Sequence, residues 1–150
     1  MPRSKSLVPL SHDHHHALKL AQALKKSTLR TESLPTMSSE EKARRALEFY
    51  ESDLALHFEA EEKLLYPFVK GRDALLDSLF LEIMEEHKKI KLQIESLREG
   101  GGLLEEKLDY LGRLLEGHIR KEERELFPRI QEVFSEAELN NLNGKIKAVR

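Results

Sequence analysis

Apolar residues recur every three or four positions along most of the chain, which is the spacing of one face of an α-helix. No stretch shows the clean alternation of apolar and polar residues that is typical of a β-strand. Glycine and proline interrupt the pattern rarely, with seven and five residues in 150. The pattern predicts four long amphipathic helices, over residues 11–26, 38–66, 72–98 and 104–127.

Serine residues mark the predicted helix starts. Serine is a favoured N-cap, and a glutamate three residues later completes a capping box. This arrangement predicts a first helix capped by Ser11 and a second that begins at Ser38 with Glu41. It also predicts a short last helix after Ser135, with Glu138 as its partner.

Proline and loop-forming residues mark the predicted ends. Pro67 is expected to stop or kink the second helix, because proline lacks a backbone N–H and clashes with the preceding turn. Pro128 is expected to interrupt the fourth helix, which can resume as far as Phe134. Residues 27–36 are predicted to form a loop, and glycines 100–102 end the third helix.

Four long helices with short connections predict an all-α fold, an up-down-up-down antiparallel four-helix bundle. We expect one domain over residues 1–150, with the bundle over about 8–134 and a short C-terminal helix over about 136–148 packed on its outside. A coiled dimer is the alternative, but the connections are short enough for the helices to pack within one chain.

An internal repeat carries the candidate chemistry. The segment from His57 to Pro67 matches the segment from His118 to Pro128 in the pattern H-x3-E-E-x3-L-[YF]-P. A weaker repeat precedes each segment, because Asp13-His14 aligns with Glu86-His87. The repeat therefore predicts two helical hairpins, each with one histidine followed by one His-x3-Glu motif.

Residues four apart lie on one face of a helix, so His57 with Glu61, and His118 with Glu122, can bind one centre together. Both motifs fall on the apolar face, where a glutamate is costly unless something pairs with it. Bound metal would satisfy two such glutamates and the four histidines, which include His14 and His87. Solvated helix contacts are the simpler alternative, but the position on the apolar face and the repeat argue against it.

The composition narrows the kind of metal site. The chain has no cysteine, so any metal would be held by nitrogen and oxygen. The net charge of −2 does not indicate the excess of basic residues that is typical of nucleic-acid-binding proteins. No apolar run is long enough to span a membrane. The N-terminus has no apolar core of a signal peptide, so we expect a soluble, cytoplasmic protein.

The ligand set leaves room for a further ligand. Two octahedral ions offer about twelve positions, of which four histidines, two bridging carboxylates and one bridging oxo or hydroxo group fill about ten. Open positions are typical of a site that reacts or senses. Ferritin-like bundles use Glu-x-x-His, but the positions three before the histidines hold Ser11, Leu54, Met84 and Leu115.

The histidine and glutamate motifs resemble the hemerythrin-like, or HHE, cation-binding domain over residues 8–134. The resemblance implies a four-helix bundle around a non-haem centre of two iron ions with an oxo or hydroxo bridge. The nitrogen ligands would be His14, His57, His87 and His118. Glu61 and Glu122 would be the bridging carboxylates, and O2 or NO would be the small ligand.

Two departures from the oxygen-carrying hemerythrins change the functional expectation. Those proteins have a second histidine one turn after the third-helix ligand, where this chain has Lys91. Their last carboxylate lies five residues after its histidine, which is the place of Glu123 rather than Glu122. These differences argue against oxygen storage and favour the members associated with iron, O2 or NO sensing and with repair of iron centres.

Several alternatives stay open at the level of sequence. His12, His15 and His16 compete with His14 for the ligand position, and His12 with His16 can hold zinc or nickel on the surface. Manganese or zinc can replace iron, the protein partner is unknown, and nothing decides whether the protein is an enzyme. The second hypothesis is a helical interaction module with a degenerate site or a single structural metal.

Some neighbouring side chains are candidates for supporting roles. A metal-bound histidine usually donates its other N–H to a carboxylate or carbonyl, and Glu86, Asp53 and Glu62 are near in sequence. Tyr50 is expected in the core, with an approach to the site as the alternative. Lys91 is expected either to bind a carboxylate near the site or to extend into solvent.

Overall fold

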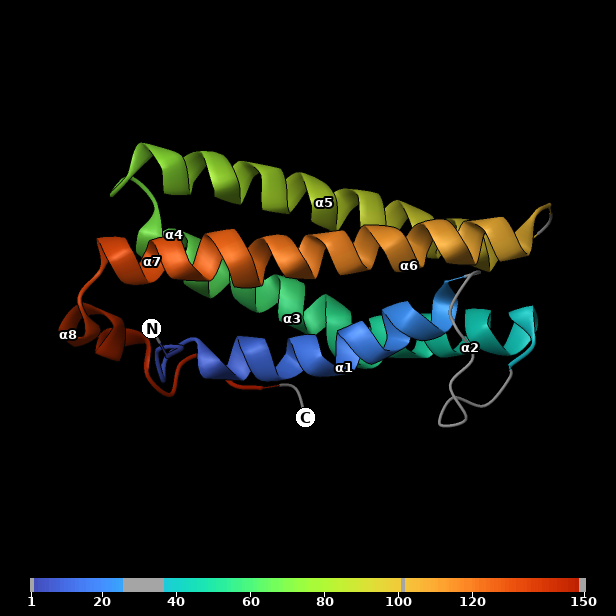
Figure 1. Cartoon of the computed structure of the whole chain (residues 1–150), viewed down its shortest axis with the longest axis horizontal. Helices are drawn as coiled ribbons and strands as arrows, with labels where there is room; N and C mark the ends of the chain where they lie inside the picture. Colours follow the sequence, from blue (N-terminus) through green and yellow to red (C-terminus); the bar gives the residue numbers. More distant parts are fainter. Residues whose placement is uncertain (1, 26–36, 101, 149–150) are drawn as a thin grey trace.

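The computed structural model describes residues 2–25, 37–100 and 102–148, and this part of the chain is helical without any strand. Figure 1 shows the arrangement of the helices. The elements are α1 (Val8–Leu24), α2 (Ser39–Phe49), η1 (Tyr50–Leu54), α3 (Ala55–Ala60), η2 (Glu61–Leu65), α4 (Tyr66–Val69), α5 (Ala74–Glu99), α6 (Leu104–Lys121), η3 (Glu122–Leu126), α7 (Phe127–Val133), α8 (Glu136–Leu139) and η4 (Asn140–Leu142).

The described helices form long stretches that run side by side (Figure 1). α1 is followed by the unbroken stretch from α2 to α4, then by α5, and then by the unbroken stretch from α6 to α7. Successive stretches run in opposite directions in Figure 1. α6 makes the most extensive contacts of any described helix, with α1 and with α5.

The first helix begins earlier than predicted. α1 starts at Val8, with Leu7 at its N-cap and a proline in its first turn, so Ser11 is not the cap. Proline is favoured in this turn because its missing N–H is not needed there. Ser11 instead donates its hydroxyl hydrogen to the carboxylate of Glu123, at 2.8 Å. Lys26 and the predicted loop 27–36 lie outside the described residues.

Pro67 does not stop the second helix as expected, whereas the fourth helix continues past Pro128 to Val133, close to the predicted limit of Phe134. A π-helical turn precedes each proline, with a hydrogen bond from the Tyr66 N–H to the Glu61 carbonyl and from the Phe127 N–H to the Glu122 carbonyl. The proline then falls in the first turn of the next α-helical segment, where it is tolerated. The wide turns therefore let the helical stretches continue to Val69 and Val133, and each begins at a glutamate of the repeat.

The C-terminal helix is shorter than predicted. The capping box of Ser135 and Glu138 is present as expected, but helical structure ends at Leu142 rather than near residue 148. The following Gly144 has a φ of 83°, a left-handed conformation that glycine adopts without strain. The segment packs against the start of α1, where the Ser6 hydroxyl donates to the Leu139 carbonyl at 2.6 Å.

The other predicted helix boundaries agree more closely with the structure. Ser38 caps α2 and accepts a hydrogen bond from the Glu41 N–H, as one half of the predicted capping box. Asp73 caps α5 in the same way through the Leu76 N–H. α6 starts at Leu104, as predicted. No described helix combines the length and the apolar character needed to cross a membrane.

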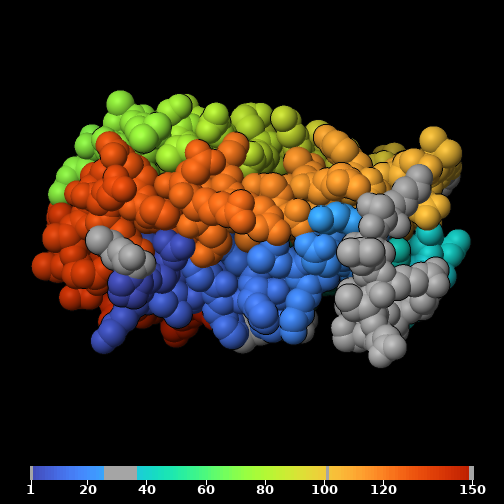
Figure 2. Space-filling model, viewed as in Figure 1, coloured from blue at the N-terminus to red at the C-terminus, as the bar shows by residue number. Residues whose placement is uncertain are grey.

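The core consists of two apolar clusters with a polar layer between them. On α1, His14 lies between Leu10 of one cluster and Ala17 of the other. On α5, the residues that flank His87 in the same way are Ile83 and Ile90. On the face drawn in Figure 2, side chains of α1 and α6 close over this interior. The fold thus places a polar layer inside a packed apolar core, where polar groups need partners.

Candidate metal centre

The structure brings all six predicted site residues into the polar layer. The four histidines have exposed fractions of 2–4%, and both glutamates have 0%. In the competing cluster, His12 and His15 are exposed and His16 is partly buried. His14 is therefore the histidine of that group that faces the interior, together with His57, His87, His118, Glu61 and Glu122.

The six side chains form two overlapping groups. His14 and His57 join Glu61 and Glu122 in one group, and His87 and His118 join the same two glutamates in the other. Within each group the candidate ligand atoms lie within 4.8 Å of one another. The two glutamates are thus shared, so the layer offers two neighbouring positions for a cation, each with nitrogen and oxygen donors.

The contacts inside the layer follow the internal repeat. Within each His-x3-Glu motif, Nε2 of the histidine lies close to its own glutamate: 3.4 Å for His57 and 3.3 Å for His118. The other two histidines contact the glutamate of the opposite hairpin. His14 Nε2 lies 2.7 Å from Glu122 Oε1, and His87 Nε2 lies 3.1 Å from Glu61 Oε1. Each glutamate therefore joins the two hairpins.

Many polar atoms in this layer have no hydrogen-bond partner. These buried atoms are the Nε2 atoms of His14, His57 and His118, Oε2 of Glu61, and both carboxylate oxygens of Glu122. The short contact of His14 with Glu122 is an ion-pair distance without the alignment of a hydrogen bond. Unpartnered buried polar atoms are costly, and cations between them would satisfy all six. The donor set thus fits bound metal.

The protonation of the cluster follows from its charges. Burial alone would lower the pKa of His14, but the carboxylates of Glu122 and Glu123 outweigh it and raise the pKa to about 9. Burial also opposes the protonation of His57 and His87, and neighbouring carboxylates raise the pKa of both, that of His57 strongly. Burial opposes ionisation of Glu61, but His57 and His87 hold its pKa well below the usual value. A metal ion must displace these protons.

The other ring nitrogen of each buried histidine faces a carboxylate. The Nδ1–H groups donate to Glu123 from His14 (2.6 Å), to Asp13 from His57 (3.0 Å), to Glu62 from His87 (2.6 Å) and to Glu86 from His118 (2.8 Å). An ionised carboxylate only accepts, so the nitrogen must be the donor. These bonds leave every Nε2 facing the two glutamates.

The sequence identified two of these four carboxylates. Glu62 and Glu86 were candidates, whereas Asp13 and Glu123 were missed as partners of the histidines. Asp53, the third candidate, is buried and accepts a hydrogen bond from Ser52. The repeat contained the signal, because Asp13 aligns with Glu86 and Glu123 aligns with Glu62.

Aromatic rings form the walls of the layer. The ring of Phe58 stacks on His87 with 3.8 Å between centroids, and it meets His118 edge-on at 5.5 Å. Phe127 lies parallel to His14 at 5.6 Å. Such rings exclude water and restrict the imidazoles to one orientation. Phe127 is the aromatic position of the repeated L-[YF]-P motif, whereas the sequence did not single out Phe58, which lies in an ordinary apolar position.

Two residues of uncertain role in the sequence now have a place. Tyr50 is partly buried and packs against the apolar cluster that includes Leu54, as expected for a core residue. Lys91 is exposed, which agrees with a side chain that extends into solvent. Of the adjacent Glu122 and Glu123, Glu122 belongs to both groups and Glu123 binds Nδ1 of His14.

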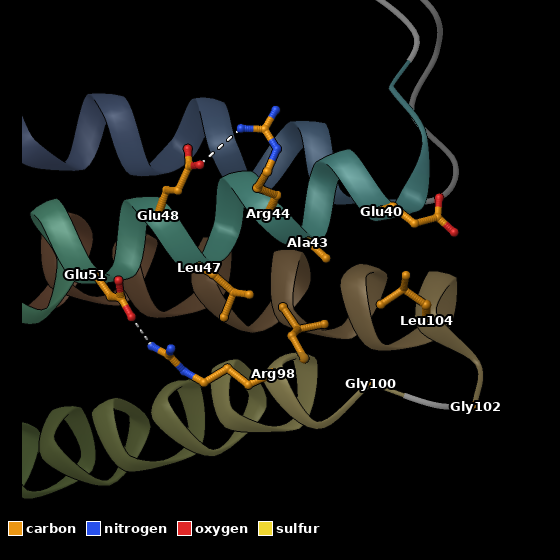
Figure 3. Close-up of a pocket in the computed structure, with 11 residues that line it drawn as sticks. Glu40, Ala43, Arg44, Leu47, Glu48, Glu51, Arg98, Gly100, Gly102 and Leu104 are labelled. Atoms are coloured by element: carbon orange, nitrogen blue, oxygen red, sulfur yellow. Dashed lines mark hydrogen bonds and ion pairs between the residues drawn. The ribbon is translucent and has the colours of Figure 1, made fainter.

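A separate groove of about 650 Å³ lies at the end of the molecule formed by α2 and the turn between α5 and α6 (Figure 3). Its floor is apolar, with Leu47 and Leu104 among the lining residues. On its rim, Arg98 pairs with Glu51 at 2.6 Å. The residues of the polar layer do not line this groove, so it is not a path to them.

Comparisons with known proteins agree with this geometry. The family model described as the hemerythrin HHE cation-binding domain matches residues 7–130, close to the predicted range of 8–134. Neither the comparison with curated proteins nor that with solved structures gave a match. The matched residues cover most of the chain and include both His-x3-Glu motifs, and so the chain belongs to the hemerythrin HHE cation-binding domain family.

Proposed function

We propose that this protein binds two iron ions in the polar layer and uses them to bind or sense O2 or NO in the cytoplasm. The framework would be an up-down-up-down four-helix bundle. The observation that carries the proposal is the sharing of Glu61 and Glu122 by two groups of histidines. Such sharing is what two adjacent ions, bridged by two carboxylates, require.

The ligand count supports a reactive centre over a purely structural one. Each ion would take two histidine nitrogens and one oxygen from each of Glu61 and Glu122. This makes about four protein ligands, whereas iron commonly accepts about six. When bound, such an iron pair supplies reversible coordination of a small diatomic ligand. We therefore propose metal roles for His14, His57, His87, His118, Glu61 and Glu122.

The surroundings of the layer support the same function. Phe58 and Phe127 present apolar surfaces beside the histidines, which suits a small uncharged ligand such as O2 or NO. The absence of cysteine from the chain leaves nitrogen and oxygen as the strong donors, and this set suits iron, with manganese and zinc as competitors. The handling of iron is the related role that the same site supports.

The test is a titration of the protein, prepared without an affinity tag and without oxygen, with ferrous iron. We expect saturation at about two ions per chain, and a change in the absorption spectrum when O2 or NO is added. The His57→Ala variant should lose about one of the two ions while keeping its helical circular dichroism. His15→Ala is the matched control, because His15 is exposed on α1.

Two results would contradict the proposal. Binding of less than about one iron per chain, with no spectral response to O2 or NO, would exclude an iron pair. Binding of only one ion by the wild-type protein, unchanged in His57→Ala, would favour an interaction module with one structural metal. Parallel titrations with manganese and zinc identify the preferred metal.

A further inference from the structure

The four Nδ1 hydrogen bonds all cross between helical stretches. Asp13 of α1 accepts from His57 of α3, at 3.0 Å. Glu62, in the same stretch as His57, accepts from His87 of α5, at 2.6 Å. In each case the carboxylate lies on one stretch and the histidine on the next stretch along the chain.

The same direction continues around the molecule and closes. Glu86 of α5 accepts from His118 of α6, at 2.8 Å. Glu123, in the same stretch as His118, accepts from His14 of α1, at 2.6 Å. Every stretch therefore supplies one carboxylate to its neighbour and receives one for its own histidine, so the four bonds form a closed ring.

Each carboxylate of this ring is adjacent in sequence to a residue of the polar layer. Asp13 and Glu86 each precede a histidine, and Glu62 and Glu123 each follow a shared glutamate. This arrangement explains two features of the repeat: the acidic residue before His14 and His87, and the doubled glutamate of each motif. A residue adjacent to a layer residue is turned about 100° around the helix, so it faces the neighbouring stretch.

We propose that Asp13, Glu62, Glu86 and Glu123 are positioning residues that together hold the four histidines with Nε2 toward the metals. This inference rests on the proposed function and deepens it. The ring links the ligands across helices, so the loss of one carboxylate releases the histidine of the next stretch. The layer residue beside the lost carboxylate in the sequence keeps its own support.

Two members of the ring are themselves held by other groups. The ammonium group of Lys121 donates a hydrogen bond to the carboxylate of Glu86, at 2.7 Å. Arg3 binds Glu123 at 3.0 Å, and the Ser11 hydroxyl donates to it at 2.8 Å. These contacts fix the carboxylates before any metal binds. Positioning of this kind reduces the cost of assembling the ligands.

The test uses Asp13→Asn and Glu86→Gln, which keep the size of the side chain and remove its charge. Zinc is the probe, because the loaded protein is diamagnetic and the exchangeable Nδ1–H protons can be recorded by NMR. We expect Asp13→Asn to shift the Nδ1–H signal of His57, and Glu86→Gln to shift that of His118. Each variant should bind zinc about 10- to 100-fold more weakly.

The matched control is Glu125→Gln, which changes an exposed glutamate of the same helical stretch as Glu123. It should move neither signal and leave zinc affinity unchanged. If Asp13→Asn does not fold, Glu62→Gln replaces it, because the side chain of Glu62 is 42% exposed; its expected readout is the His87 signal.

The outcomes separate this inference from the proposed function. Suppose that the wild-type protein binds two zinc ions. If Asp13→Asn then shifts the Nδ1–H signal of His14 rather than that of His57, or changes the zinc affinity less than about twofold, the inferred ring is wrong but the proposed metal site stands. If the wild-type protein binds no metal, the proposed function fails. The same Nδ1–H signals recorded without metal then still test the ring.

Discussion

The Nε2 atom of His14 lies 2.7 Å from Oε1 of Glu122, which joins the first long helical stretch to the last. Glu122 also lies 3.3 Å from Nε2 of His118 through its other oxygen. One carboxylate thus contacts histidines of both groups, whereas each histidine belongs to one group. Shared and unshared residues should therefore respond differently to substitution.

The first prediction compares His14→Ala with Glu122→Ala. Loss of His14 removes a ligand from one proposed ion, so we expect bound iron to fall from about two ions to about one per chain. Loss of Glu122 removes a ligand from both ions and should reduce bound iron below about one. Metal analysis after desalting measures this difference. Equal losses in the two variants would contradict the sharing of Glu122.

The second prediction concerns close packing of α1 on α6 at Gly112. A Cβ atom there would lie 2.8 Å from the Ala21 carbonyl oxygen and 3.1 Å from Cβ of Leu24. Because backbone must shift to make room, Gly112→Ala should lower the free energy of unfolding by about 1–3 kcal/mol. Urea unfolding of the metal-free protein measures the change.

Gly117, also in α6, provides the control, because a Cβ atom there meets nothing within 4 Å. Gly117→Ala should raise the free energy of unfolding by about 0.5–1 kcal/mol, since alanine favours the helix. Equal stabilisation of Gly112→Ala and Gly117→Ala would contradict the close packing of α1 on α6 at Gly112.

The third prediction is a pH dependence at the start of α5. Arg129 binds both oxygens of Asp73 at 3.0 Å, and this contact, with the hydrogen bond from the Leu76 N–H, lowers the pKa of Asp73 despite some desolvation. A lowered pKa means that the carboxylate stabilises the fold above its usual pKa and stops doing so as the pH falls through the lowered value.

Asp73→Asn keeps an N-cap but removes the ion pair, so it isolates this effect. We expect the variant to be less stable than the wild type at neutral pH, with the difference shrinking as the solution becomes acidic. Urea midpoints at several pH values provide the measurement. A difference that grows on acidification would show that the carboxylate is not stabilised by Arg129.

The fourth prediction concerns the C-terminal segment, which lies beyond the residues matched by the family model. Leu139 has an exposed fraction of 0% and packs in the cluster that includes Leu7 and Phe127. Leu139→Ala should cost about 2–5 kcal/mol of stability, as expected for a buried leucine. Leu92, with 67% exposure, is the control, and Leu92→Ala should change stability by less than about 0.5 kcal/mol.

Much of the fold followed from the sequence because its pattern is local. Helical periodicity identified the long helical stretches, and the internal repeat selected the histidines and glutamates that the structure places in the polar layer. The alignment of Asp13-His14 with Glu86-His87 also selected the interior histidine from a cluster of four. The helices depend on spacings of three or four residues and the repeat on matching segments, and both are visible in a single sequence.

Other features depend on contacts between distant segments, which spacing does not contain. The π-helical turns at Glu61 and Glu122 carry the helices past Pro67 and Pro128, and nothing in the sequence pattern predicted these turns. The partner of His57 is Asp13, a residue of another helix, and proximity in sequence suggested Asp53 instead. Such pairings follow from the way helices pack, which sets side chains against each other across the core.

Anomalous diffraction from crystals of the iron-loaded protein tests the central claim most directly. We predict two metal peaks in the polar layer, both in contact with Glu61 and Glu122. One peak should also contact His14 and His57, and the other His87 and His118. A single peak, or peaks only at His12 and His16 on the surface of α1, would contradict a pair of ions held by the shared glutamates.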